Sequence, residues 1–247
     1  MVQRTAVISG AGTGIGAACA QALSSSCDRL VLVGRRLEKL QEVAATLPGN
    51  VQVHVGSCDL SDPQSVQDLA DWARAELGSV DVIVSNAGSV QPPLGDSLQT
   101  MADAWASTYL ANTISAVLLI ESLAPLLPRP GGRIVIIGSA AARSGNGSPA
   151  YAAAKGALQT YAISLMRRLG PEGITANVVA PGYTDGTELV AGRISPERKE
   201  RLLRGIATGR PAAAAEIAHI VASLAAREAS FINGETVTVD GGPVVSG

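Results

Sequence analysis

Residues 5–16 read Thr-Ala-Val-Ile-Ser-Gly-Ala-Gly-Thr-Gly-Ile-Gly, an apolar run followed by four glycines in seven residues. Thr5–Ser9 has the near-continuous apolar character of a strand that is covered on both faces. Glycine allows positive φ and a close backbone approach, and the N-terminus of the helix expected after this turn attracts anions. A tight turn alone would explain two of the glycines. The stretch therefore predicts a turn that binds a dinucleotide through Gly10, Gly12, Thr13, Gly14, Ile15 and Gly16.

The same alternation of a short apolar run and a longer helical pattern continues along the chain. We expect strands at Thr5–Ser9, Leu30–Gly34, Val51–Gly56, Val80–Ser85, Arg133–Gly138, Thr175–Ala180 and Thr236–Val239. We expect helices at Gly14–Ser25, Leu37–Leu47, Pro63–Leu77, Met101–Leu127, Ala150–Leu169 and Ala213–Ala226. Asp62 is a favourable N-cap, because Pro63 after it suits the first helical position.

This alternation predicts right-handed βαβ units in a doubly wound α/β sheet of the Rossmann type. We expect seven mostly parallel strands with helices on both faces. Nothing in the composition divides the chain, so residues 1–247 are predicted to form a single dinucleotide-binding and catalytic domain. The segment from about 183 to 210 breaks the rhythm and contains a short helix that starts near Ser195. We expect it to cover the substrate as a lid.

Composition excludes several other functions. The chain of 247 residues is 47% hydrophobic with a net charge of −2, which indicates a globular protein without attraction for nucleic acid. Its cysteines and histidines lack metal-ligand spacing, so no metal site is expected. They are Cys19, Cys27, Cys58, His54 and His219. Unpaired thiols and the missing signal peptide favour the cytoplasm. The longest apolar runs are too short or too interrupted to span a bilayer.

The end of the second strand reads Gly34-Arg35-Arg36 and indicates which dinucleotide binds. A carboxylate at this position would bond the ribose hydroxyls of NAD and repel a 2′-phosphate. Here there is no acid, and a guanidinium suits a phosphate. Arg35 is the first candidate and Arg36 the second, so NADP(H) is favoured over NAD(H). The alternative is that both arginines are solvated residues at the start of a helix.

A catalytic set is indicated by Tyr151 and Lys155, which share one helix face at spacing i, i+4. A nearby ammonium would lower the pKa of a phenol that must exchange protons. An exposed Tyr–Lys pair on a helix is common, so this spacing alone is weak. Ser139 strengthens it, because Ser139 ends an apolar strand at the edge where ligands bind and lies twelve positions before Tyr151.

These motifs resemble those of the short-chain dehydrogenase/reductase family from Thr5 to Gly242. The first turn matches its Gly-x-x-x-Gly-x-Gly pattern, and 86–88 its Asn-Ala-Gly motif. The resemblance implies that Asp59 and Leu60 bind adenine, that Asn86 braces the sheet, and that Ala87 and Gly88 line the cofactor. Asn112, Ser139, Tyr151 and Lys155 follow the order of its catalytic tetrad. Asn112 would hold a water that links the lysine to solvent, and Lys155 would also hold the nicotinamide ribose.

Two departures from the family pattern concern the loops around the site. Pro181 and Gly182 resemble a segment in which a threonine binds the nicotinamide, but the usual position of that threonine is Gly186. Thr187 is the first candidate instead, with Thr184 as the second. The interval from Ser139 to Tyr151 is also one residue tighter than the commonest form, which trims the substrate loop.

The expected lid carries more basic than acidic residues. This surplus would suit a carboxylate, a phosphate or a carrier-linked acyl chain. A solvated amphipathic helix is the blander interpretation, and we favour it. The basic residues are Arg193, Arg198, Lys199, Arg201, Arg204 and Arg210, against Asp185, Glu188, Glu197 and Glu200.

The sequence thus predicts an NADP(H)-dependent oxidoreductase that interconverts a ketone and a secondary alcohol, with Tyr151 as general acid or base. Two alternatives stay open: an NAD(P)+-dependent alcohol dehydrogenase working in the oxidative direction, and a non-catalytic dinucleotide sensor or scaffold on the same fold. A small carbonyl or alcohol is the expected partner. The resemblance implies a homodimer or homotetramer that pairs through the helices carrying Asn112 and Tyr151 and through the C-terminal strand.

Overall fold

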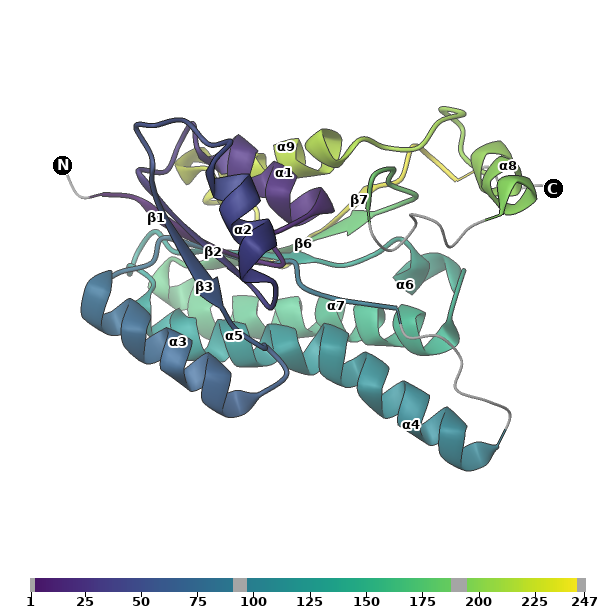
Figure 1. Cartoon of the computed structure of the whole chain (residues 1–247), viewed down its shortest axis with the longest axis horizontal. Coiled ribbons are helices and arrows are strands. Elements are labelled where there is room, and N and C mark those ends of the chain that lie inside the picture. The colour runs from purple at the N-terminus through teal and green to yellow at the C-terminus, as the bar shows by residue number, and fades with distance from the viewer. Residues whose placement is uncertain (1–2, 91–96, 188–194, 244–247) are drawn as a thin grey trace.

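A computed structural model describes residues 3–90, 97–187 and 195–243 of the chain (Figure 1). Seven strands form one sheet in the order β3-β2-β1-β4-β5-β6-β7, and every pairing between these strands is parallel. This arrangement confirms the predicted doubly wound sheet. The strands are β1 (Thr5–Ser9), β2 (Arg29–Gly34), β3 (Gln52–Ser57), β4 (Val82–Ser85), β5 (Arg133–Ile137), β6 (Thr175–Pro181) and β7 (Thr236–Val239).

Helices cover both faces of the sheet (Figure 1). One face carries α1 (Gly14–Leu23), α2 (Leu37–Ala44) and α9 (Ala214–Ala225). The other carries α3 (Pro63–Glu76), α4 (Leu98–Tyr109), the π-helical turn η1 (Leu110–Ile114), α5 (Ser115–Leu123) and α7 (Pro149–Leu169). The short helices α6 (Ala141–Ser144) and α8 (Pro196–Arg204) lie beyond one end of the sheet. Single 3-10 turns occur at Ala124–Leu126, Gly170–Glu172 and Arg227–Ala229.

The core consists of two apolar clusters, one on each face of the sheet. Side chains alternate along β1, where Val7 belongs to one cluster while Ala6 and Ile8 belong to the other. Because both faces are covered, alternation does not bring polar residues into the strand, which explains its continuous apolar sequence. Each fully buried leucine or isoleucine stabilises the fold by roughly 1.5–3 kcal/mol.

The ends of the helices are set by local signals that the sequence contains. The Asp62 carboxylate caps α3 by accepting hydrogen bonds from the backbone N–H groups of Gln64 (3.2 Å) and Ser65 (3.3 Å). This confirms the predicted N-cap. Ser195 caps α8 by accepting from Arg198 N at 3.3 Å, so the short helix also begins where it was expected.

The predicted helix Met101–Leu127 differs most from the structure. The helical run extends from Leu98 to Leu126 and contains a π-helical turn at its middle. By length and composition alone this run could cross a bilayer, which the expectation of runs too short or too interrupted did not anticipate; the core helix of a folded protein passes the same test. Within the most apolar 18-residue stretch of this helical run, 44% is buried inside the protein. We attribute the apolarity to packing over the sheet, where Leu119, Ile120 and Leu123 have no exposed surface.

Candidate active site

The crevice of the site opens where strand order reverses, between β1 and β4. In doubly wound sheets this position binds ligands. Ser9 and Asn86 hold the two strand ends together. The Ser9 hydroxyl accepts from the N–H groups of Asn86 (2.9 Å) and Ala87 (3.0 Å), and Asn86 Nδ2 donates to the carbonyl oxygens of Ser9 (3.0 Å) and Gly10 (3.2 Å). The bracing position that the resemblance implied for Asn86 therefore joins both sides of the crevice.

The glycine turn needs glycine for two separate reasons. Gly10 has φ +61°, and a Cβ there would lie 2.8 Å from Asn86 Nδ2. A Cβ on Gly16 would lie 2.2 Å from the carbonyl oxygen of Gly10, so this position needs glycine for packing. Within the described structure, Thr13 makes no side-chain cap on α1, which leaves the first N–H groups of that helix available to an anion.

A cleft of about 390 Å³ runs from this turn to the end of β2. It brings together the glycine turn, the arginine pair, the Asp59–Leu60 corner and residues 86–88, which are far apart in the sequence. The predicted cofactor residues that line it are Gly10, Gly12, Thr13, Gly14, Ile15, Arg35, Arg36, Asp59, Leu60, Asn86, Ala87, Gly88 and Thr187. Gly16 lies below the turn and is buried.

The far end of the cleft is basic. Arg35 and Arg36 are both exposed and line the cleft, and no acid follows β2 directly. Asp59 lies across from them. Its Oδ1 accepts from the hydroxyl (2.6 Å) and the N–H (3.0 Å) of Ser61, and these bonds lower the pKa of Asp59, with a smaller contribution from Arg35. This end of the cleft fits a phosphate on the adenosine ribose.

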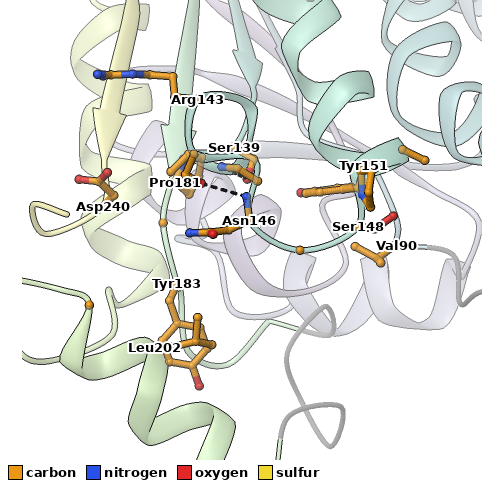
Figure 2. A pocket seen from close by; sticks show the side chains of 18 of the residues that line it. Val90, Ser139, Arg143, Asn146, Ser148, Tyr151, Pro181, Tyr183, Leu202 and Asp240 are labelled. Carbon is orange, nitrogen blue, oxygen red and sulfur yellow. Dashed lines mark hydrogen bonds between the residues drawn. The ribbon is translucent and has the colours of Figure 1, made fainter. Parts of the chain in front are cut away.

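Ser139 and Tyr151 line a second and larger cavity, which opens at the carboxyl edge of the sheet and has a volume of about 2040 Å³. Ser139 follows β5, and its Oγ accepts from Ala141 N at 3.2 Å, which ties it to the first turn of α6. Tyr151 lies in the first turn of α7. Figure 2 shows its side chain extending across the pocket toward Ser139. The predicted fold-back of the loop between these two residues is therefore present.

Lys155 lies one turn further along α7 and is 3% exposed. Its Nζ donates to the carbonyl oxygen of Ile137 at 2.9 Å and lies 5.9 Å from the centre of the Tyr151 ring. Burial removes the ammonium from water and lowers the pKa of Lys155 to about 8. A position next to the phenol is confirmed, although the ammonium is directed to the strand end.

The pKa of Tyr151 does not follow the prediction. Burial raises it above its ordinary value, and a hydrogen bond with Ser139 opposes the rise. Tyr151 is therefore a neutral phenol near pH 7, which suits a proton donor.

Asn112 lies in the π-helical turn η1 and is 1% exposed. Its Oδ1 accepts from Ser89 N (3.2 Å), and its Nδ2 donates to Ser89 O (2.7 Å) and Thr108 O (2.9 Å). A Cβ on Gly88 would lie 2.6 Å from Asn112 Oδ1 and 3.2 Å from Lys155 Nζ. Gly88 thus lets the strand end approach both side chains, and π-helical turns of this kind are frequent at functional sites.

The segment after β6 separates the remaining candidates. Thr187 is buried against the glycine turn, with atoms 3.4–3.6 Å from the position of a Cβ on Gly14. Thr184 is also buried, but it lines neither cavity of the described structure. Pro181 and Gly182 line the larger cavity and not the cleft. The sequence also predicts that residues 89–95 and 140–148, with the lid, border the substrate; of these segments, 91–95 and 188–194 lie outside the described residues.

Sequence reasoning missed several residues of both cavities. Lys39 lines the cleft one turn after Arg35. The only signal for it in the sequence is that lysine is rare among the basic residues of this chain. Met101 and Trp105 on α4 line the larger cavity and are 50% and 37% exposed. The feature of the sequence that could have revealed them is an apolar face of the helix that does not pack against the core. Among the described residues, no group of three or more His, Cys, Asp or Glu side chains is placed to hold a metal.

Fold and site together define a Rossmann-type, dinucleotide-binding class of protein. Residues 10–243 match a family model described as enoyl-(acyl carrier protein) reductase. The chain is 34% identical over 242 residues to FabG, the 3-oxoacyl-[acyl-carrier-protein] reductase of Escherichia coli K12, covering 97% of this chain and 96% of that protein. It therefore belongs to the short-chain dehydrogenase/reductase family of oxidoreductases.

Other relatives differ in what they act on. Meso-2,3-butanediol dehydrogenase of Serratia marcescens is 32% identical over 246 residues, with 98% of this chain and 95% of that protein covered. Among solved structures, a blue fluorescent protein from a metagenomic library, in complex with NADPH, has a TM-score of 0.85 and 30% identity over 97% of both chains.

Proposed function

We propose that this protein is an NADPH-dependent carbonyl reductase that converts a ketone into a secondary alcohol. The observation that carries the proposal is the juxtaposition of Ser139 and Tyr151, at the wall of a large cavity, with a cleft that ends in two exposed arginines. A sensor or scaffold would need the cleft alone. Relatives include a 3-oxoacyl reductase and a protein crystallised with NADPH.

The cofactor assignment rests on charge and shape. The 2′-phosphate would lie against Arg35, with Arg36 and Lys39 close by, and the pyrophosphate at the start of α1. Thr187, next to Gly14, is the proposed contact for the nicotinamide amide. When bound, the cofactor supplies the hydride, and the protein supplies orientation and the proton.

Ser139 and Tyr151 in the wall of the larger cavity, and the buried Lys155 and Asn112 behind it, have distinct proposed roles. The Ser139 hydroxyl accepts from Ala141 N, which leaves its own hydrogen to donate to a carbonyl oxygen in the cavity. Tyr151, kept neutral by burial, gives its proton to that oxygen as the alcohol forms. Lys155, next to the phenol, stabilises the phenolate that remains. Asn112 holds the backbone of Ser89 beside this lysine.

The oxidative direction is the second candidate, favoured by the butanediol dehydrogenase among the relatives. It requires Tyr151 as a phenolate that takes the alcohol proton. Burial raises the pKa of Tyr151 and opposes that state, so oxidation of an alcohol should need a higher pH than reduction of a ketone.

The first experiment measures oxidation of NADPH and of NADH by the purified protein across a panel of carbonyl compounds. The panel contains 3-oxoacyl thioesters, 2-enoyl thioesters, keto acids, cyclic ketones and quinones. We expect turnover of a ketone with NADPH and little with NADH. Turnover of enoyl thioesters alone would contradict the ketone assignment, and a preference for NADH would contradict the role of Arg35.

Two variants serve as controls in that experiment. Tyr151→Phe should lose at least a hundredfold in kcat while it still binds NADPH, because it removes only the proton donor. Arg35→Gln should raise the KM for NADPH about tenfold and leave the KM for NADH unchanged. Near-normal turnover by Tyr151→Phe would mean that another group donates the proton.

A further inference from the structure

The wall of the larger cavity opposite α4 is formed by α8, which stands beyond the carboxyl edge of the sheet (Figure 1). Leu202 of this helix and Tyr183 both line the cavity, and Figure 2 draws them below Ser139 and Tyr151. Arg198 and Arg201, each one turn or less from Leu202 on the same helix, also line the cavity. The helix therefore presents both apolar surface and positive charge to the substrate.

The four arginines of this segment that the structure describes, Arg198, Arg201, Arg204 and Arg210, divide into two groups by their partners. Arg204 donates to Glu200 at 3.0 Å, and Arg210 donates to Glu216 at 2.8 Å; neither arginine lines the cavity. Across residues 3–90, 97–187 and 195–243, no carboxylate pairs with Arg198 or Arg201. The arginines without a partner are thus the ones that face the cavity.

A third guanidinium and two carboxylates complete the charges of this cavity. Arg143 of α6 lines the cavity, and Figure 2 shows it on the side of Ser139 away from Tyr151; Asp240 lines the cavity as well. Asp240 Oδ1 accepts from Gly242 N at 3.1 Å. Glu197 is held at the start of α8 by Ser195 and the backbone, which lower its pKa. Both acids already have partners in the chain, whereas Arg198 and Arg201 do not.

We propose that the substrate is a ketone that carries an anionic oxygen group, a carboxylate or a phosphate ester, and that Arg198 and Arg201 bind this group. The inference rests on the proposed function, because the ketone must lie between Ser139 and Tyr151. The apolar side chains of Met101, Trp105 and Leu202 then pack on the carbon skeleton. A guanidinium binds both carboxylates and phosphates through paired hydrogen bonds.

The test compares matched substrates that differ only in charge. Acetoacetate, levulinate and 5-oxohexanoate are assayed against their methyl esters, and dihydroxyacetone phosphate against dihydroxyacetone, all at saturating NADPH. We expect kcat/KM at least tenfold higher for one or more anions than for the matched neutral ketone. A preference confined to the keto acids identifies a carboxylate, and one confined to dihydroxyacetone phosphate identifies a phosphate.

Variants of α8 show whether the arginines cause the preference. Arg198→Gln and Arg201→Gln should each raise the KM for the preferred anion about tenfold, with kcat and the neutral ketone unaffected. Arg204→Gln is the matched control, because it removes the same charge from the same helix but faces Glu200. If all three variants weaken the preference for anionic substrates equally, the overall positive charge of the helix causes that preference. This result would overturn the assignment of Arg198 and Arg201 as the binding residues.

A binding measurement separates this inference from the proposed function. Trp105 lines the cavity, so quenching of tryptophan fluorescence by each anion reports binding without turnover. Anion binding that Arg201→Gln weakens, without reduction of any ketone, would support the anion site and refute the reductase. Reduction of neutral ketones as fast as of anions would refute the anion site and leave the reductase standing.

Discussion

The most unusual residue of the site is Lys155, a cation held in the interior. Because Lys155 is 3% exposed and its ammonium donates to the backbone carbonyl of Ile137 without a carboxylate beside it among the described residues, the folded state disfavours its charge. Its pKa falls from an ordinary value of 10.5 to about 8. The group therefore destabilises the fold wherever it stays protonated, and we attribute its presence to catalysis.

The pH dependence of stability tests this view of Lys155. Its folded pKa lies below its unfolded pKa, so the unfolded chain binds more protons between pH 8 and 10.5 and stability rises with pH there. The shift corresponds to ~3 kcal/mol. Lys155→Met should be more stable than the unmutated protein at pH 7 by up to that amount, with a smaller difference at pH 10. Urea unfolding at both pH values measures it.

The free energies of unfolding of Lys155→Met and of the unmutated protein could also differ by the same amount at pH 7 and pH 10. In that case packing, and not the charge of Lys155, would cause the difference. Lys199→Met is the control, because Lys199 lies on the exposed surface of α8 and its loss should leave the pH dependence unchanged.

The sequence predicts the position of a residue best where the order of strands and helices along the chain determines that position. Ser139, Tyr151 and Lys155 come together because strand ends and the first turns of helices meet at one edge of a parallel sheet. The pKa of Tyr151 could not be predicted in this way, since it depends on burial. Likewise, the sequence shows how many arginines the lid contains, but ion pairing in space decides that Arg204 is neutralised and Arg201 is not.

At the scale of elements, local signals were sufficient for most boundaries. Thr5–Ser9 and Thr236–Val239 form strands with the predicted bounds, because glycine or polar residues flank both. Helix α6 was expected as loop, since four residues are too few for a helical pattern. The π-helical turn was missed as well, because polar Asn112 and Thr113 in an apolar run were its only trace.

The N-cap of α3 offers a test at this scale. Asp62→Ala should lower the free energy of unfolding by about 1 kcal/mol, because two N–H groups lose their acceptor. Asp62→Asn keeps an acceptor oxygen and should recover most of that loss in urea unfolding. Equal losses in the two variants would mean that the carboxylate charge, and not the cap, stabilises the helix.

At the scale of the whole molecule, two groups of exposed apolar side chains lie apart from the apolar face of α4 that borders the larger cavity. Leu110 and Ile114 on η1 lie with Ile163 on α7, and Phe231 with Ile232 precedes β7. Phe231 is fully exposed. These places coincide with the two contacts that the family resemblance implied, so we expect a homodimer or homotetramer. That residues 1–247 form one domain with a lid over about 183–210 also stays a prediction.

Light scattering tests the assembly directly. We expect a mass of two or four times 25.0 kDa, reduced by Ile163→Asp and, for a tetramer, by Phe231→Asp. Both side chains are exposed, so the substitutions spare the core. Leu37→Asp is the control, because Leu37 is 40% exposed on α2, away from both places. A mass of 25.0 kDa for the unmutated protein would contradict the expectation.

The π-helical turn also restricts how the length of this chain can vary. Each helical residue rotates the chain by about 100°, so removing one residue from Leu110–Ile114 would turn α4 by that angle relative to α5. Leu119 and Leu123 could then not stay in the core while Met101 and Trp105 face the cavity. Relatives with this site should therefore conserve the number of residues between these positions more strictly than the residues themselves.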